Sequence, residues 1–342
     1  MKRILWTIFG LMALTLFFLF RPGLTPPEIV VPDRLPELAF DVSMAELAIQ
    51  QREEKFEPLK EDNHTRIIWA SSYEEKKAPC SVVYIHGFTA SYGEGDPFHR
   101  RVAEALGCHL YIPRLHAHGR ITDEPMLDIN ADSLLADAVH SLAVAQILGE
   151  RVLVMGNSMG GLFSVFLASS FPEEIDGLVL LAPLLEFAMP EASLFDTRWG
   201  QRIMRMRLRS RYLDVPVEHE KQPQYWYTQY RIESLMTLKT LKETLLTDSV
   251  YSSIVAPVFV GYYYKDEENQ DNLVSVTAIE NMKHQLGTPD DLIRFEAFPD
   301  AGNHVITSRY RTNVYEETAE SVIAFFKESG VLRQQEASKE QP

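Results

Sequence analysis

Short apolar runs alternate with longer helical patterns from residue 66 onward, and this alternation constrains the possible folds more than any other feature of the sequence. Most runs are apolar at several consecutive positions, which is typical of strands covered by helices on both faces. The strand-like runs are residues 66–70, 82–85, 109–112, 151–155, 177–181 and 257–261. The helical patterns are residues 97–106, 132–148, 159–171 and 315–327. Their order predicts an α/β protein with a doubly wound, mostly parallel sheet and right-handed crossovers.

Chain length and charge narrow the class further. With 342 residues, the chain could hold two domains or one large α/β domain with an insertion. Its hydrophobic content of 46% and charged content of 24% are those of a folded globular protein, which excludes a disordered or polytopic membrane chain. The 48 acidic residues against 33 basic ones give a net charge of -15, and such a chain repels phosphate backbones. We therefore expect no nucleic-acid partner.

An apolar segment without charged residues runs from Ile4 to Phe20, directly after Lys2 and Arg3. At about 1.5 Å per residue, a helix of roughly 17 residues just crosses a bilayer core of about 30 Å. Because no small-residue cleavage site follows, we interpret residues 1–21 as an uncleaved membrane anchor. One alternative is a cleaved signal peptide, which would give a secreted protein. The other alternative is a buried core helix. The basic residues predict a cytoplasmic N-terminus and an exported catalytic domain, on the periplasmic side in a bacterium.

Three further boundaries follow from local composition. Residues 22–42 contain prolines at 22, 26, 27, 32 and 36 and are expected to form an extended spacer. Ser43 and Glu46 form a capping-box pattern, which predicts a helix over about residues 44–56 and the start of the folded domain, residues 43–333. The polar residues 334–342 are expected to form a disordered tail.

The strongest chemical signal is Gly156-Asn157-Ser158-Met159-Gly160, which lies between a strand-like run and a helical pattern. A nucleophilic serine on a sharp strand-to-helix turn needs glycines two residues before and after it, because side chains there would leave no room. The helix that begins at this turn also favours developing negative charge near its N-terminus. Ser158 is therefore the candidate nucleophile.

A serine that transfers acyl groups also needs two N–H donors, a base and an acid. We expect the donors to be the amides of Met159, which follows the serine, and Phe88, which follows the strand-like run at 82–85. His304 lies between the last strand-like segment and the last helical pattern, so it is the candidate base. The acid should lie in the acidic loop after residues 257–261, where we choose Asp271 and keep Asp266 as the alternative.

Two other histidine features have alternative interpretations. His116 and His118 form an H-x-H pair that could bind a metal, but no third ligand lies at suitable spacing, so we predict that they line a loop beside the site. His86 is interpreted as a structural histidine that bonds its surrounding loop.

Four motifs in this order resemble the α/β-hydrolase fold, particularly its monoacylglycerol lipase and carboxylesterase branch. They are the residues 86–88 after a strand, the stretch 114–119, the serine turn 156–160 and the residues 302–304, within a resemblance that covers about residues 60–330. The chain departs from the family in its longer acidic loop and in His116-Ala117-His118, where relatives usually have Arg-Gly-His. The resemblance implies a helical lid at residues 184–254. Its apolar residues, among them Met204, Trp226 and Leu235, would select an acyl chain or simply form the core of the lid.

From these residues and the resemblance we interpret the chain as a serine hydrolase of carboxylic esters with an apolar acyl group, such as a monoacylglycerol or lysophospholipid. Ser158 would attack, His304 would take its proton, Asp271 would orient the imidazole, and the Phe88 and Met159 amides would stabilise the oxyanion. No metal or organic cofactor is implied. The alternatives are an amide or thioester hydrolase on the same site, and a catalytically silent scaffold that binds lipid or protein.

The two cysteines, Cys80 and Cys108, each start a strand-like run. In the fold that the chain resembles, these strands are adjacent and parallel, which would bring the cysteines close to disulfide distance. One structural disulfide in an exported domain is therefore expected, with two buried free thiols as the alternative.

A basic segment lies within the expected lid. It contains six arginines and no acidic residue: Arg198, Arg202, Arg205, Arg207, Arg209 and Arg211. Such a segment could contact an anionic bilayer. The alternative is that these arginines pair with acidic residues elsewhere on the lid.

Overall fold

The structure is a computed structural model that describes residues 2–19, 29–56, 58–195 and 198–332. The expected disordered tail, residues 334–342, and the first part of the expected spacer, residues 22–28, lie outside the described residues.

The described residues form one seven-stranded sheet with the order β1-β3-β2-β4-β5-β8-β9. β1 runs antiparallel to β3, with Arg66 opposite Ile112, and every other neighbouring pair is parallel. The strands are β1 (Arg66–Ile68), β2 (Ala78–Ile85), β3 (His109–Ile112), β4 (Gly149–Asn157), β5 (Gly177–Leu181), β8 (Val258–Tyr262) and β9 (Ile293–Ala297). The predicted doubly wound, mostly parallel sheet is therefore confirmed.

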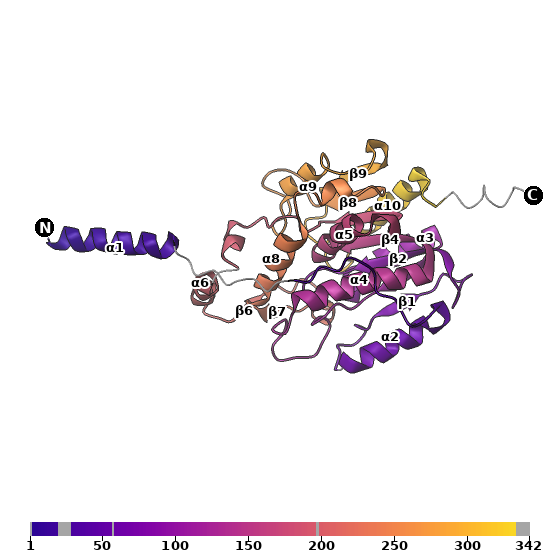
Figure 1. The fold of residues 1–342 in the computed structure, drawn as a ribbon, viewed down its shortest axis with the longest axis horizontal. Helices are drawn as coiled ribbons and strands as arrows, with labels where there is room; N and C mark the ends of the chain where they lie inside the picture. The colour runs from indigo at the N-terminus through magenta and orange to yellow at the C-terminus, as the bar shows by residue number, and fades with distance from the viewer. Residues whose placement is uncertain (1, 20–28, 57, 196–197, 333–342) are drawn as a thin grey trace, which may run out of the picture.

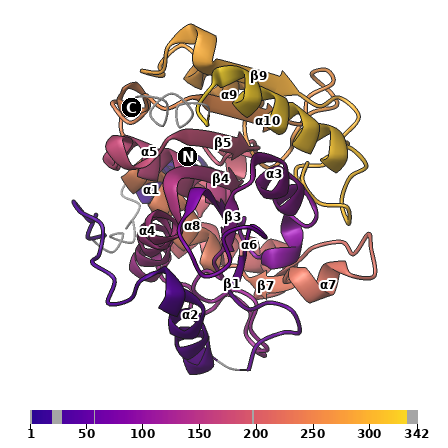
Figure 2. The ribbon, with the colours of Figure 1, turned by 90° about the vertical axis from the view of Figure 1, so that its right-hand side faces the viewer.

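Helices cover both faces of the sheet, which explains why the strands are apolar at consecutive positions. On β4, for example, Val154 belongs to the core beneath one set of helices and Met155 to the core beneath the other. One face carries α4 (Ala131–Leu148), α5 (Met159–Ser170) and α9 (Val276–Met282). The opposite face carries α3 (Phe98–Leu106) and α10 (Tyr315–Ser329) (Figure 2).

The N-terminal helix α1 (Lys2–Leu19) stands apart from this body (Figure 1). Several of its large apolar side chains are exposed, including Trp6, Phe9 and Met12. In the described residues, α4 is long and apolar enough to cross a membrane, but most of α4 is buried inside the fold.

The chain after residue 28 packs along the body before the first domain helix begins. Ile29 is buried, and the Val30 N–H donates to Asp132 Oδ1 at 3.3 Å. The expected helix over 44–56 is shorter than predicted: α2 (Ala45–Glu53) lies between single 3₁₀ turns at Val42–Met44 and Glu54–Phe56. The capping-box prediction for Ser43 is wrong, because the Asp41 carboxylate caps the turn by accepting the Ser43 N–H at 3.0 Å and the Ser43 hydroxyl at 2.7 Å.

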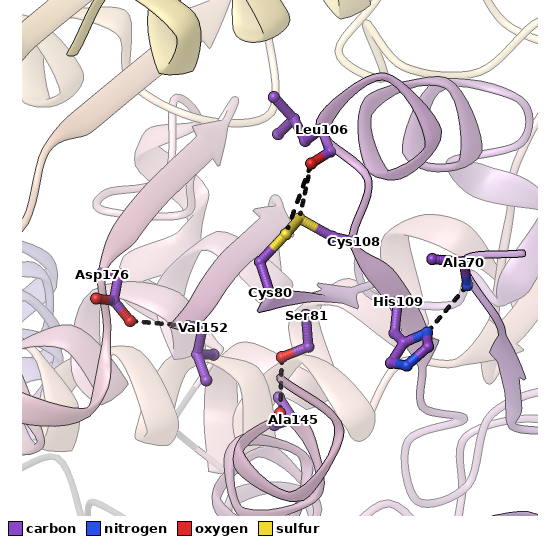
Figure 3. Close-up of a disulfide and its surroundings, with 9 residues drawn as sticks. All are labelled: Ala70, Cys80, Ser81, Leu106, Cys108, His109, Ala145, Val152 and Asp176. Atoms are coloured by element: carbon purple, nitrogen blue, oxygen red, sulfur yellow. Dashed lines mark hydrogen bonds between the residues drawn. A yellow bond between two sulfur atoms is a disulfide. The ribbon is translucent and has the colours of Figure 1, made fainter. Parts of the chain in front are cut away.

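A disulfide joins Cys80 to Cys108, with 4.7 Å between their Cα atoms (Figure 3). The two cysteines lie at the starts of the parallel neighbours β2 and β3, where Ser81 pairs with His109. The expected disulfide is confirmed, and the alternative of two free thiols is wrong.

The chain between β5 and β8, residues 182–257, forms an insertion on the sheet. Helices make up much of it, but it also contains a two-stranded antiparallel sheet that the sequence did not predict, because each strand is three residues long. Its elements are η5 (Pro190–Leu194), α6 (Arg198–Leu208), β6 (Tyr212–Asp214), α7 (Gln222–Tyr225), β7 (Gln229–Arg231), α8 (Ser234–Leu245) and η6 (Tyr251–Ser253). Within it, Trp226 and Leu235 are buried and Met204 is partly buried.

Candidate active site

Ser158 lies on the sharp turn between β4 and α5, with a positive φ of 54° and a ψ of -113°. This backbone conformation is rare for a residue with a side chain and places strain at the turn. The flanking glycines are required by space: a Cβ on Gly156 would lie 2.2 Å from the Gly160 carbonyl oxygen, and a Cβ on Gly160 would lie 1.9 Å from the Ile85 oxygen. The turn can therefore pack against β2 only with glycine at both positions.

Backbone hydrogen bonds fix the serine at the carboxyl end of β4. The Ser158 N–H donates to the Leu181 carbonyl at 2.9 Å. The Ser158 carbonyl accepts from Leu162 at 3.1 Å and from Leu184 at 3.0 Å. The serine is thereby tied to β5, to α5 and to the start of the insertion.

Asp271 and His304 form a buried pair at the same edge of the sheet. They follow the parallel strands β8 and β9, and His304 Nδ1 lies 2.5 Å from Asp271 Oδ2. The Asp271 side chain is fully buried, and its Oδ1 accepts the backbone N–H groups of Leu273 at 2.9 Å and Val274 at 3.1 Å. These bonds orient the carboxylate, so that its other oxygen faces the imidazole.

The local charges raise the pKa of His304 above its ordinary value of 6.5. Burial alone would lower it, but the charge and hydrogen bond of Asp271, together with the charge of Glu94, outweigh burial. An imidazole in this setting can accept a proton and hold it. No hydrogen bond joins Ser158 Oγ to His304 within the described residues.

Asp266, the alternative acid, is engaged elsewhere. Its carboxylate accepts the backbone N–H groups of Glu268 at 3.0 Å and Asn269 at 2.8 Å, and also the Asn269 side-chain amide. It closes an exposed turn and makes no contact with His304 among the described interactions.

The two expected oxyanion donors, the Phe88 and Met159 amides, belong to segments that lie next to the serine. In the described chain, neither the Phe88 N–H nor the Met159 N–H donates a hydrogen bond. Met159 is the first residue of α5, whose first N–H groups have no partner inside the helix. The loop that carries Phe88 passes close by, since a Cβ on Gly87 would lie 3.3 Å from the Ser158 Cβ.

Two buried histidines brace the loop that carries Phe88. His86 Nδ1 lies 2.9 Å from the Gly87 oxygen, and its Nε2 accepts the Leu115 N–H at 3.2 Å. His118 Nε2 accepts the Thr89 N–H at 3.2 Å. Burial lowers the pKa of both rings, to about 4 for His86, so both are neutral at pH 7. His86 is thus the structural histidine that the sequence suggested.

The H-x-H pair likewise bonds the chain around it. His118 Nδ1 lies 2.7 Å from the His116 oxygen, and His116 Nε2 lies 3.0 Å from the Asp128 oxygen. In the ranges that the structure describes, no group of three or more His, Cys, Asp or Glu side chains could hold a metal ion.

Glu94 is a site residue that the sequence analysis missed. Its side chain is buried, and its Oε2 accepts the Gly87 N–H at 2.8 Å and the Tyr84 hydroxyl at 3.2 Å. Burial raises the pKa of Glu94 to about 7, while the charge of His304 acts in the opposite direction. Glu94 therefore bonds the loop that carries Phe88, and its charge interacts with that of His304. The only sign of this close packing in the sequence is that Gly93 and Gly95 flank Glu94.

Apolar side chains of the insertion gather around Phe88. Its ring meets that of Tyr230 edge to face at 5.5 Å, and the Tyr227 N–H donates to the Thr89 oxygen at 2.9 Å. A small apolar cluster surrounds this contact, made of Ala192, Phe195 and Leu235, with Phe88, Phe187, Met204, Leu213 and Tyr230 packed against it. The insertion thus contacts the loop that carries one expected oxyanion donor.

A strained serine after β4 and a His–Asp pair after the last parallel strands are the features that define the α/β-hydrolase class of site. A model of the alpha/beta hydrolase family matches residues 82–316. The chain therefore belongs to this family, as its resemblance predicted.

Comparisons with individual proteins point to lipolytic relatives. The chain is 38% identical over 100 residues to Lipase 3 of Moraxella sp. strain TA144 and 34% identical over 100 residues to Lipase 1 of Psychrobacter immobilis. Each match covers 29% of this chain and 30% of the relative, so the chain matches less than a third of their length.

Solved structures show the same fold over most of the chain. A structure from work on the metagenome-derived lipolytic enzymes LipS and LipT has a TM-score of 0.63 at 18% identity, covering 79% of this chain and 99% of that one. A monoacylglycerol lipase of Paleococcus ferrophilus has a TM-score of 0.55 at 13% identity, covering 80% of this chain and 99% of its own.

Proposed function

We propose that the protein is a serine hydrolase that cleaves carboxylic esters through an acyl-enzyme. The observation that carries the proposal is the buried His304–Asp271 pair, which lies at the same edge of the sheet as the strained Ser158. The Phe88 and Met159 amides belong to segments next to the serine and donate no hydrogen bond in the described chain, which supports their proposed role as donors to a developing oxyanion.

The proposed reaction has two halves. Ser158 Oγ forms a bond to the ester carbonyl carbon while its proton passes to His304 Nε2, and the alcohol then leaves with that proton. A water molecule next attacks the acyl carbon and gives a proton to His304. The bond between this carbon and Ser158 Oγ then breaks, His304 returns the proton to Ser158 Oγ, and the carboxylic acid leaves. Asp271 holds the imidazole by its Nδ1–H throughout and stabilises its charged form.

An apolar acyl group suits the surroundings of the serine best. The apolar cluster around Phe88 offers contacts for such a chain on the oxyanion side of the site. The relatives named as lipases support the same substrate class. We accordingly propose that the insertion acts as the lid of the site and that the substrate is a lipid-like ester, such as a monoacylglycerol.

We further propose that α1 anchors the protein in a membrane and that the hydrolase body lies on the exported side. The exposed apolar side chains of α1 and the basic Lys2 and Arg3 before its apolar segment support this orientation. The disulfide between Cys80 and Cys108 is the kind of bond that persists in an oxidising compartment.

Hydrolysis of a series of p-nitrophenyl esters by the full chain in detergent micelles tests the proposed function. We expect turnover that increases from short to medium acyl chains and disappears in Ser158→Ala. A protein that cleaves none of these esters, but cleaves the matched amide or thioester, would refute the ester assignment. A folded wild-type protein without any turnover would support the silent scaffold instead.

A further inference from the structure

The outward face of α6, together with Arg209 directly after it, carries exposed side chains that the proposed catalytic reaction does not use. We name this surface the basic patch and define it by its residues Arg202, Ile203, Met206, Arg207 and Arg209. All five are exposed, and Met206 leaves 71% of its surface accessible to solvent. A large apolar side chain among arginines is the composition of surfaces that contact anionic bilayers.

The inner face of the same helix holds α6 on the insertion. Met204 packs against the apolar cluster that contains Phe195 and Leu235. Arg205 forms an ion pair with Glu233, which also accepts from Arg231 at 2.7 Å. The alternative prediction, that the arginines of this segment pair with acidic residues of the lid, is therefore correct for Arg205, whereas Arg207 and Arg209 remain exposed.

The positive charges of Arg207 and Arg209 are not neutralised locally. α6 contains no acidic residue, and within the described ranges Arg207 and Arg209 form no ion pair or hydrogen bond. The whole chain, in contrast, has a net charge of -15. An anionic surface would therefore repel most of the molecule and attract this patch, which orients the body electrostatically.

The chain that leads from α1 enters the body at the active-site edge of the sheet. Val30 bonds Asp132 in the first turn of α4, and α4 begins after the carboxyl end of β3, at the edge where Ser158 also lies. The span from Leu19 to Ile29 reaches at most about 35 Å when fully extended. α6 lies at the end of the molecule from which α1 extends (Figure 1).

We propose that the basic patch docks on the anionic surface of the bilayer that holds α1 and turns the active-site edge of the sheet toward that membrane. The proposal rests on the proposed anchor. It does not depend on ester hydrolysis, because none of its residues belongs to the site that contains Ser158. For a lipid-like substrate, such docking would shorten the path from the membrane to the serine.

A fluorescent probe at position 206 tests the docking. The full chain with Met206→Cys, labelled with an environment-sensitive fluorophore, is reconstituted in phosphatidylcholine vesicles with or without about 30 mol % phosphatidylglycerol. We expect a blue shift and about a twofold stronger emission in the anionic vesicles at low salt, lost near 0.5 M salt, where the Debye length falls to about 4 Å. The same probe at Asp291→Cys, before β9 at the opposite edge of the sheet, should show neither effect.

Charge variants show whether binding depends on the basic patch or only on the net charge of the protein. Arg207→Gln with Arg209→Gln should abolish the blue shift at position 206. Lys76→Gln with Lys77→Gln removes the same charge at the start of β2, on the opposite edge, and should leave the shift intact. Equal emission in both kinds of vesicle, or a shift that survives loss of the two arginines, would overturn the proposal.

Activity on a soluble short-chain ester is measured in parallel, so that failure of the docking and failure of the proposed function can be told apart. We expect all charge variants to match the wild type in this assay. Absence of hydrolysis in every protein would refute the proposed function only, and the probe result would still decide the docking.

Discussion

From the burial of Glu94 we predict how the unfolding free energy changes with pH. The pKa of Glu94 is raised to about 7 in the folded protein, above the value of 4.5 expected in an unfolded chain. The folded state therefore binds the proton more tightly, and the resulting stabilisation is fully present below pH 4.5 and is lost as the pH rises through 7. A shift of this size corresponds to about 3 kcal/mol of unfolding free energy.

Glu94→Gln removes this titration and keeps an oxygen that can accept the Gly87 N–H and the Tyr84 hydroxyl. The unfolding free energy of the variant minus that of the wild type should therefore rise by about 3 kcal/mol between pH 4.5 and pH 8. Urea unfolding of the full chain in detergent, followed by tryptophan fluorescence at several pH values, measures this difference. The exposed Glu104→Gln serves as the matched control and should show no such rise.

His304 needs its own control, because its raised pKa also makes stability fall as the pH rises above 6.5. Measuring Glu94→Gln in a His304→Ala background removes that contribution. The difference in unfolding free energy between Glu94→Gln and its parent protein should therefore be measured in both backgrounds. If this difference stays constant across the pH range in both, Glu94 is not a buried carboxyl that titrates there.

Three further predictions concern the catalytic pair and the disulfide. Asp271→Asn should lower kcat by about 10³–10⁴-fold, whereas Asp266→Asn should have a modest effect; steady-state kinetics in which the two variants exchange places would reassign the acid. kcat/KM should rise with pH as His304 loses its proton, with a midpoint above 6.5 that moves down in Asp271→Asn; an unmoved midpoint would contradict the pairing. Replacing Cys80 and Cys108 by serine should lower the unfolding free energy by about 3–4 kcal/mol, since the bond closes a loop with a sequence separation of 28; urea unfolding with no loss would refute a stabilising role.

The sequence predicted the central sheet well, because its five inner strands are buried on both faces and must be apolar at consecutive positions. The serine turn was equally predictable, since the close approach of Gly160 to Ile85 permits no side chain. The family model confirms the fold that these features suggested.

Other features depend on contacts between distant segments and leave little trace in the sequence. Glu94 looks like an ordinary loop carboxylate, and only the folded chain buries it against Tyr84 and the Gly87 amide. The strands β6 and β7 have three residues each, which is too short for the alternation of apolar and polar residues to be recognised in the sequence. Asp41 and Ser43 are both good caps by residue type, and the conformation of the chain decides that Asp41 accepts the bond.

Covalent labelling shows whether Ser158 is the nucleophile. The full chain is treated with a fluorophosphonate probe, digested, and examined by mass spectrometry for the modified residue. We expect one modified site, Ser158, with labelling abolished in Ser158→Ala at unchanged melting temperature and strongly slowed in His304→Ala. Labelling that persists in Ser158→Ala, or a folded wild-type protein that takes up no probe, would contradict the role of Ser158 as an activated nucleophile.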